Sequence, residues 1–540
     1  MKRNGQGLVT ISQPITPQRR GLPEMPISHF TLLITSVLLL VSCSEEPTSV
    51  SSTLIINAII FDGTGADGYD GSVRIDGNRI VAVGDIATLN GETIIDATGL
   101  ALAPGFIDTH SHHDSNMDEY RHMPGVLSQG VTTIVRGADG FSGTDDEFGF
   151  IPQSEFNRTF AATPAAVNVA SYSPHNSIRY RIMGTDNRRE ATVDEVAAMA
   201  SLVEADMRDG AVGLATGLEY EPGIFSATQE IIELAKVAAK YGGGYMSHVR
   251  DEDDRFMDAI DEVIRIGREA GLPVHISHIK LADRAFWGTT DSVIEVLNSA
   301  RASGVDITAD IYPYQRWASN LAVLFPARNF SDRDVADFTF AHTANPEDII
   351  LSHFAPNPEF DGLSIADVAR ITERDPATTL MELTQAADDY LRETGRGGAS
   401  IIAKGMIGSD VAALMRWEFT NICSDGSHGG GHPRGYGAFP RVLGHYVREL
   451  KVLTWPEAIY KMTGRSADAM GFKDRGQLKV GNYADLVLFD PETIIDNATM
   501  DDSTALSTGV HSVWVNGVLA FENGTPTKRF SGRVITRGNR

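Results

Sequence analysis

The sequence predicts an α/β protein: a (β/α)8 TIM-like barrel with a small β-sandwich built from both ends of the chain. Three observations support this prediction. The middle of the chain, 104–470, alternates short apolar strands with amphipathic helices, as parallel sheets require. Blocks of strands and turns without such helices flank it at 53–103 and 471–540. Finally, metal-binding side chains recur where the central strands end, as in barrels whose active site lies at one mouth.

Composition and charge fit a globular enzyme. Of 540 residues, 42% are hydrophobic and 22% are charged, which are ordinary fractions for a folded protein with a large core. The formal charge of −25 argues against a nucleic-acid partner, for which a basic surface would be expected. The charge also favours solubility.

The N-terminal segment reads as an export signal. Residues 30–42 form an apolar run too short to span a bilayer comfortably, and the run ends in Leu-Val-Ser-Cys43, which resembles the bacterial lipobox. We interpret 1–43 as a lipoprotein signal peptide with Cys43 as the lipidated residue, and 44–52 as a polar tether. The protein would then lie in the bacterial cell envelope, facing the periplasm and touching the membrane through the lipid anchor only. A buried helix that ends in a chance cysteine is the alternative.

Cysteine usage is sparse. The chain has two cysteines, and with Cys43 lipidated only Cys423 remains. No intrachain disulfide is then possible, even in an oxidising compartment. Stability must come from packing.

The two flanking blocks are predicted to pair into one sandwich. Apolar runs interrupted by Asp-Gly and Asn-containing turns are typical of hairpins. The predicted strands are 54–61, 72–75 and 79–83 in the first block, and 476–480, 484–489 and 510–518 in the second.

The central region supplies the barrel strands. With the strand around Phe106 and Ile107, the apolar runs approach the eight that a barrel needs: they are 132–135, 166–170, 212–215, 244–248, 274–278, 307–311 and 420–425. Helical periodicity lies between them, for example at 193–208 and 231–241. The stretch of about 315–415 is too long for one crossover, so we interpret it as an insertion that covers the barrel mouth. Arg316 and Arg328 within it would favour acidic substrates.

Four of the predicted strands end in potential metal ligands. His110 and His112 follow the first strand and, being two apart, point to the same face. His248, His278 and Asp425 close three later strands. Because the carboxyl ends of barrel strands converge on one pocket, we expect these side chains to meet. Imidazole and carboxylate suit zinc best, with nickel, cobalt or iron possible, and a carboxylate beside the metal can act as general acid and base.

Longer motifs strengthen this interpretation. In order along the chain they are Pro-Gly-Phe-Ile-Asp-Thr-His-Ser-His (104–112), Gln-Gly-Val-Thr-Thr (129–133), Gly-Leu-Glu-Tyr-Glu-Pro-Gly (217–223), Ser-His-Val-Arg-Asp-Glu (247–252), Ile-Ser-His-Ile-Lys (276–280), Asp-Ile-Tyr-Pro-Tyr (310–314), Ser-Asp-Gly (424–426) and His-Pro-Arg-Gly-Tyr-Gly-Ala-Phe-Pro-Arg-Val-Leu-Gly (432–444). Together they resemble the amidohydrolase superfamily and, within it, the N-acyl-D-amino-acid deacylase (D-aminoacylase) family. The resemblance covers nearly the whole mature chain.

The resemblance implies the hydrolysis of an N-acyl-D-amino acid to a carboxylate and a D-amino acid, with one or two Zn²⁺ ions as cofactor. It also implies a role for each matching residue. The roles are His110 and His112 at the more exposed metal position, His248 and His278 on the tightly held zinc, Asp425 as catalytic base, Tyr220 on the scissile carbonyl, and Lys280, Tyr312 and Arg434 on the substrate's α-carboxylate, with Arg250 close by.

One departure concerns the metal site. The family commonly carries a Gly-Asn-Cys-Gly turn whose cysteine is a metal ligand, whereas this chain reads Gly137-Ala-Asp139-Gly140. Asp139 takes the place of the thiolate. A carboxylate can ligate or bridge zinc but is a harder ligand than sulfur, so the residue either belongs to the metal site or forms only an Asp-Gly turn.

Two other functions compete with this one. A cyclic amide hydrolase of the dihydropyrimidinase type, or a dipeptide hydrolase, would keep the same fold. Cyclic-amide enzymes of the superfamily usually place a carboxylated lysine between the metals, and no lysine ends the predicted strands before His248. A non-catalytic lipoprotein that binds a ligand would require the loss of metal or catalytic residues, and none of them is missing.

Overall fold

The computed structural model describes residues 52–142 and 149–537. The predicted signal peptide, Cys43 and nearly all of the predicted tether lie outside the described residues. Within these two described ranges, no helix is long and apolar enough to cross a membrane.

A barrel of parallel strands forms the centre of the described chain, which confirms the predicted fold class. Two parallel sheets build it, with orders β6-β7-β8 and β9-β10-β11-β12-β13-β17. One residue separates β8 from β9, so these strands join the sheets on one side. On the other side the Asp425 amide donates to the His110 carbonyl at 2.9 Å, which links β17 to β6 and closes the barrel. The strands are β6 (Phe106–Asp108), β7 (Val131–Arg136), β8 (Asn168–Ser171), β9 (Ser173–Pro174), β10 (Gly213–Gly217), β11 (Gly244–His248), β12 (Val274–Ile276), β13 (Ile307–Ile311) and β17 (Thr420–Ile422).

Amphipathic helices pack outside these strands. In α6 (Phe256–Ala270), Phe256, Ile260, Val263 and Ile264 recur at helical spacing and are buried. The N-terminus of α4 (Val193–Arg208) is fixed by a capping box between Thr192 and Glu195. The remaining helices of the barrel region are α1 (Pro124–Leu127), α2 (Gln153–Ala162), α3 (His175–Met183), α5 (Thr228–Lys240), α7 (Thr290–Ala302), α11 (Gly408–Arg416), α12 (Arg434–Arg441), α13 (Trp455–Met462) and α14 (Gly464–Met470).

Both ends of the described chain form one sheet, in the order β21-β20-β19-β18-β5-β1-β2-β3 with β4 beside β1. The sheet folds over its own core, because Ile55 and Val73 from one end share an apolar cluster with Leu488 and Trp514 from the other. This is the small β-sandwich of the prediction. The run 476–480 forms no strand. The strands are β1 (Thr53–Ile60), β2 (Tyr69–Asp76), β3 (Arg79–Gly84), β4 (Thr93–Asp96), β5 (Ala101–Pro104), β18 (Leu486–Phe489), β19 (Val510–Val515), β20 (Val518–Glu522) and β21 (Thr525–Pro526).

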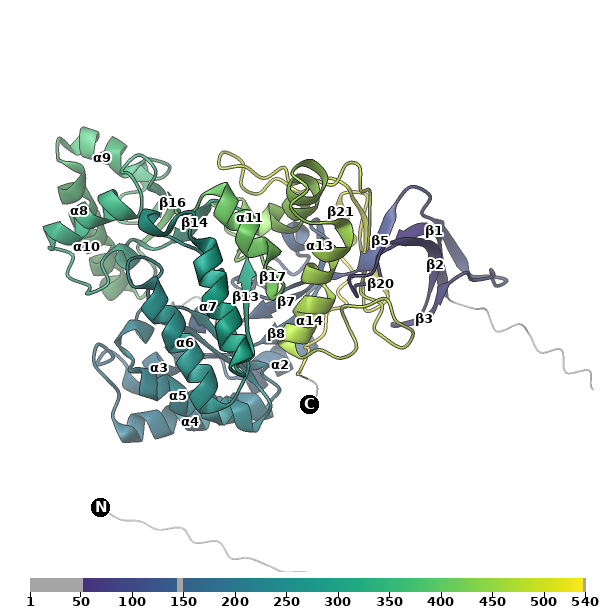
Figure 1. Cartoon of the computed structure of the whole chain (residues 1–540), viewed down its shortest axis with the longest axis horizontal. Coiled ribbons are helices and arrows are strands. Elements are labelled where there is room, and N and C mark those ends of the chain that lie inside the picture. The colour runs from purple at the N-terminus through teal and green to yellow at the C-terminus, as the bar shows by residue number, and fades with distance from the viewer. Residues whose placement is uncertain (1–51, 143–148, 538–540) are drawn as a thin grey trace, which may run out of the picture. The chain divides into compact units, whose positions relative to one another are not determined.

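The long stretch between β13 and β17 forms a subdomain of its own. Its antiparallel sheet has the order β14-β16-β15. The last strand in the chain, β16 (Ala399–Lys404), therefore lies between β14 (Arg316–Ser319) and β15 (Ile350–Phe354). Its helices are α8 (Arg333–His342), α9 (Ile365–Thr372) and α10 (Pro376–Thr394), which are grouped far from β1, β2 and β3 in Figure 1. Because β14 begins five residues after β13 ends, this subdomain starts at the mouth of the barrel. Helix α11 then returns to the barrel and contacts β13 and β17.

Candidate active site

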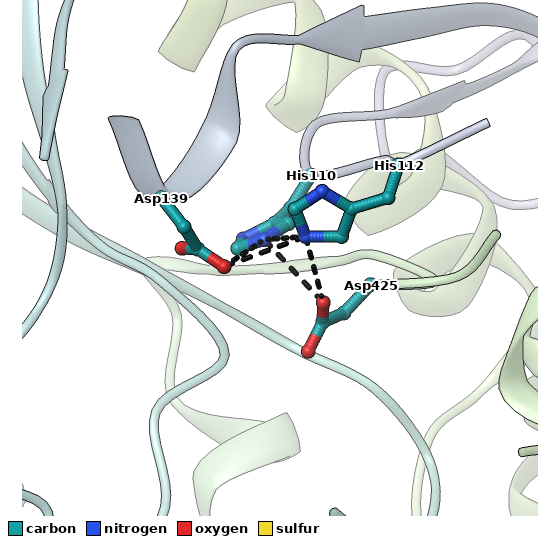
Figure 2. Close-up of side chains that lie close together, drawn as sticks. All are labelled: His110, His112, Asp139 and Asp425. Carbon is teal, nitrogen blue, oxygen red and sulfur yellow. Dashed lines mark hydrogen bonds and ion pairs between the residues drawn. The ribbon is translucent and has the colours of Figure 1, made fainter. Parts of the chain in front are cut away.

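Four predicted site residues meet at the mouth of the barrel. His110 and His112 follow β6, Asp139 follows β7, and Asp425 follows β17, and their side chains converge in Figure 2. The Nε2 atoms of the two histidines are 3.3 Å apart. Each lies 3.4 Å from Asp139 Oδ2, and the distances to Asp425 Oδ1 are 3.5 Å from His110 and 3.3 Å from His112. The first candidate metal position is therefore lined by two imidazoles and two carboxylates.

A second group of ligands adjoins the first. His248, at the end of β11, has its Nδ1 atom 2.9 Å from Nε2 of His278, which follows β12. His278 Nε2 is also 3.8 Å from Asp139 Oδ1. Asp139 thus offers one carboxylate oxygen to each group, and the three side chains could hold a cation together.

Backbone strain is concentrated at these ligands. Asp139, His278 and Asp425 have φ values of 54°, 33° and 48°, in the left-handed region that residues other than glycine rarely adopt. Glycines 137 and 140 on either side of Asp139 also have positive φ. Strain of about 1–3 kcal/mol per residue persists only where the surrounding structure enforces it, and such residues cluster at functional sites.

The donor atoms fit a metal ion. Asp139 Oδ1, which faces the second ligand group, is buried and has no hydrogen-bond partner among the described residues. Burial alone would lower the pKa of His112, but the carboxylates of Asp139 and Asp425 raise it to about 10. The group therefore attracts positive charge, and a cation satisfies the carboxylates without protonating the imidazoles. Imidazole with carboxylate is a donor set for zinc.

Asp425 is held in its ionised form. Its Oδ2 atom is 2.6 Å from Nη1 of Arg434. Burial alone would raise the pKa of Asp425, but the Arg434 cation lowers it well below the usual range of an aspartate. The carboxylate can therefore accept a proton at neutral pH.

Tyr220 lies beside His248 and keeps its proton. Its ring centroid is 4.4 Å from that of His248, and its hydroxyl accepts a hydrogen bond from Ser319 at 3.3 Å. Burial, together with the carboxylates of Asp139 and Glu219, raises the pKa of Tyr220 well above its usual value. The hydroxyl is thus available as a hydrogen-bond donor.

Two of the predicted carboxylate-binding residues lie beside the ligands. Lys280 Nζ is 2.6 Å and 2.8 Å from the two carboxylate oxygens of Glu252 and 2.7 Å from His278 Nδ1. The Tyr312 hydroxyl is buried without a hydrogen-bond partner in the described part of the chain. Both side chains, with Arg434, line one cavity.

The structure does not bring Arg250 into this cavity. Its guanidinium forms two hydrogen bonds to the Glu262 carboxylate on α6, both of 2.8 Å, and a third to the Ile224 carbonyl. Arg250 follows β11 by two residues, and its side chain turns outward toward the helix. Its position near His248 in sequence therefore does not make it a substrate ligand.

Three acidic residues complete the site without having been singled out from the sequence. Glu219 is 2.7 Å from His248 Nε2, and Glu252 binds Lys280. Asp310 accepts hydrogen bonds from the His278 amide and from Cys423, and lies 3.0 Å from His275 Nε2. All three lie inside the family-like motifs, which were the only signal that could have identified them.

Two hollows meet at the ligands. The inner cavity is the smaller of the two and contains His248, His278, Lys280 and Tyr312 in its wall. The outer cleft is larger, is partly open to solvent, and is lined by His112, Asp139 and residues of the insertion. Tyr220, Ser319, Asp425 and Arg434 line both hollows. A substrate can therefore occupy both hollows with its reactive bond between them.

A parallel barrel with histidine and aspartate ligands at its mouth defines a metal-dependent hydrolase. The chain belongs to the amidohydrolase family, whose sequence profile matches residues 93–521.

Individual relatives narrow the comparison. The chain is 34% identical to a D-aminoacylase of Alcaligenes xylosoxydans xylosoxydans, over 92% of this chain and 99% of the relative. It is also 34% identical to an N-acyl-D-glutamate deacylase of the same organism, over 88% and 95%. Its fold matches the crystal structure of N-acyl-D-glutamate deacylase from Bordetella bronchiseptica, complexed with zinc and a phosphonate inhibitor, with a TM-score of 0.79 and 31% identity over 90% of this chain and 99% of the other. The resemblance inferred from the motifs is confirmed.

Proposed function

We propose that this enzyme hydrolyses the amide bond of N-acyl-D-amino acids to a carboxylate and a free D-amino acid. The observation that carries the proposal is that the potential metal ligands lie next to donors that suit a substrate carboxylate. Six potential metal ligands converge between the two hollows, and three donors for an α-carboxylate line the inner one. The ligand set comprises His110, His112, Asp139, His248, His278 and Asp425. The named activities of the relatives support the same reaction.

Zinc is the cofactor that these residues suit. His110, His112 and Asp425 would hold an ion on one side, and His248 and His278 an ion on the other, with Asp139 between them. When bound, zinc polarises a carbonyl and lowers the pKa of water to roughly 7.

The remaining steps belong to the side chains. Asp425 accepts a proton from the attacking water and passes it to the amide nitrogen, while the C–N bond breaks and the new carboxylate forms. Tyr220 donates a hydrogen bond to the carbonyl oxygen as negative charge develops on it. Such donors act most strongly where water is excluded, and Tyr220 lies at the junction of the two hollows.

Substrate handedness follows from fixing two groups of the substrate, the α-carboxylate and the amide. Lys280, Tyr312 and Arg434 would hold the α-carboxylate in the inner cavity, and the metal ligands fix the amide. Arg434 has five N–H donors, so it can bind Asp425 and a substrate carboxylate together. With the carboxylate and amide fixed, only one enantiomer directs its side chain into the cavity.

A substrate panel tests the proposal. Zinc-loaded enzyme would be assayed with N-acetyl-D- and N-acetyl-L-amino acids and with a hydantoin, and free amine would be measured. We expect D-enantiomers to be hydrolysed preferentially and Asp425→Asn to remove the activity. Equal rates for both enantiomers, faster opening of the hydantoin, or full activity in the variant would refute the proposal.

We further propose that the chain is a lipoprotein of the bacterial cell envelope that faces the periplasm and is anchored through Cys43. The support is the apolar run 30–42 and the lipobox-like Leu-Val-Ser-Cys that follows it. Expression with labelled palmitate should label the full-length chain and place it in the membrane fraction. Cys43→Ser should lose the label and leave the membrane, and a labelled Cys43→Ser chain would exclude this anchor.

A further inference from the structure

We propose that the D-amino acid preferred by this enzyme carries a basic side chain of the lysine type, and that Asp253 binds its cationic end. This inference rests on the proposed function and specifies its substrate. It follows from what the inner cavity contains besides the groups already assigned to the reaction.

The inner cavity also has wall residues that the reaction does not use. If Lys280, Tyr312 and Arg434 hold the α-carboxylate and the amide lies at the metal ligands, the substrate side chain would extend along this part of the wall. The remaining wall residues on which the argument depends are Asp253, Ala282, Trp317, Val323, Leu324 and Thr343.

Most of this wall is apolar. Ala282, Trp317, Val323 and Leu324 are all more than 90% buried and surround the cavity with hydrocarbon and indole surface. Long basic side chains bury their methylene stems along such surface while the charged end finds a polar partner. The wall therefore fits the stem of a lysine-like side chain.

Unsatisfied polar atoms mark the rest of the wall. Asp253 Oδ1, Thr343 Oγ1 and Trp317 Nε1 are buried and have no hydrogen-bond partner in the described residues. Thr343 is 2% exposed. Because an unsatisfied buried polar group costs free energy, such atoms in a cavity wall indicate a ligand that supplies the missing partners. The Trp317 N–H needs an acceptor, whereas an ionised Asp253 can only accept, so the ligand group that lies at Asp253 must donate.

The charges of the cavity favour a cation in the same way. Lys280 is paired with Glu252 at 2.6 Å and Arg434 with Asp425 at 2.6 Å. Glu219 is 2.7 Å from His248. Asp253 is the carboxylate of the inner wall that has no such partner among the described residues.

The surroundings of Asp253 add further negative charge. Burial and the carboxylates of Glu219, Asp251 and Glu252 raise the pKa of Asp253 well above its usual range. The empty cavity therefore favours the protonated carboxyl of Asp253, and a substrate cation would displace that proton and pair with the carboxylate, whereas an acidic side chain would not.

The arginines expected to favour acidic substrates do not line the inner cavity. Arg316 binds Asp348 and is not part of the inner wall. Arg328 lines the outer cleft, where its guanidinium donates to the carbonyls of Ala322 and Phe325 and lies 3.5 Å from Glu221. Neither supplies a free cation for a substrate carboxylate in the inner cavity.

The test compares substrates on the intact, zinc-loaded enzyme. Nα-acetyl-D-lysine, N-acetyl-D-leucine and N-acetyl-D-glutamate would be assayed under identical conditions. We expect kcat/KM for the lysine substrate to exceed that for the glutamate substrate by at least about a hundredfold, and that for the leucine substrate by about tenfold. A ratio of one or less for lysine over either competitor overturns the inference.

Variants assign the effect to Asp253. Asp253→Asn should lower the lysine-to-leucine ratio by about tenfold or more, because the amide keeps the shape and removes the charge. Asp254→Asn is the matched control, since Asp254 is the next residue and its side chain is exposed. The control should keep the wild-type ratio. Thermal melting of all three proteins checks folding, and a folded Asp253→Asn enzyme with an unchanged ratio also overturns the inference.

The two proposals fail in different ways. If none of the three D-substrates is hydrolysed by the zinc-loaded enzyme, the proposed function fails and this inference fails with it. If the leucine or glutamate substrate is hydrolysed faster than the lysine substrate, the proposed function stands and only the assignment of the side chain fails.

Discussion

The guanidinium of Arg434 lies 2.6 Å from the carboxylate of Asp425, so one residue can both hold the substrate and control the proton acceptor. Without a cation beside it, a carboxylate as buried as Asp425 would tend to take up a proton. Arg434 prevents this and still has N–H donors for a substrate carboxylate. Substrate binding and proton transfer are therefore coupled through one side chain.

Replacing the proton acceptor tests the reaction directly. Asp425→Asn should lower kcat by about 10²–10⁴-fold, because the amide cannot accept the proton from water. Asp67→Asn, at an exposed position of the β-sandwich region, should keep wild-type activity. Steady-state kinetics together with zinc analysis of both variants distinguish a lost base from a lost metal. An Asp425→Asn enzyme with near-normal kcat would remove Asp425 from the mechanism.

Replacing the cation should change the pH dependence. In the wild-type enzyme Arg434 lowers the pKa of Asp425, so the base stays ionised down to acidic pH. In Arg434→Gln the effect of burial is no longer opposed by this cation, and the pKa of Asp425 rises. Activity is then lost at a higher pH than in the wild type as the pH falls. The measurement is the acid limb of the kcat/KM profile, and an unchanged or downward-shifted limb would contradict the coupling.

The barrel could be predicted because its strands are short apolar runs that end abruptly. The runs 244–248 and 307–311 coincide with β11 and β13. The run 476–480 also alternates apolar and polar residues, but it begins at Gly476 and is followed by Gly481, which both have positive φ. Leu478 within the run donates to the Asp62 carbonyl. Local pattern cannot reveal that the neighbouring turns leave too little length for a strand.

The site was predictable where the topology fixes direction. Residues that close parallel strands must face the same mouth, so His248, His278 and Asp425 could be placed together from the sequence. Arg250 shows the limit of this rule: like His278 it lies two residues beyond the end of its strand, yet its side chain pairs with Glu262 on α6. Asp253, three residues further, does line the inner cavity. Adjacent loop residues thus differ in direction for reasons that only tertiary packing decides.

Arg250 should matter for stability more than for catalysis. Its side chain is 19% exposed and that of Glu262 is 10% exposed, so the pair is partly buried. Arg250→Gln should lower the free energy of unfolding by about 2 kcal/mol, between the values for exposed and fully buried pairs. Denaturant unfolding measures the loss, and KM should stay near the wild-type value. Lys280→Gln is the comparison, because it should raise KM, and a comparable rise in KM for Arg250→Gln would return that residue to the substrate site.

Asp139 stands where the family commonly has a cysteine ligand, so variants at this position test whether its carboxylate binds the metal. Its carboxylate lies 3.4 Å from His110 Nε2 and 3.8 Å from His278 Nε2, so it faces both ligand groups. Asp139→Asn keeps the left-handed turn, which asparagine also tolerates, and removes the charge. If Asp139 is only a turn residue, this variant keeps its zinc and activity. We expect instead that zinc per chain falls and that kcat at limiting zinc decreases about tenfold or more. Asp139→Cys should retain zinc because a thiolate binds it strongly, and loss of metal in the cysteine variant would argue that the carboxylate itself is required.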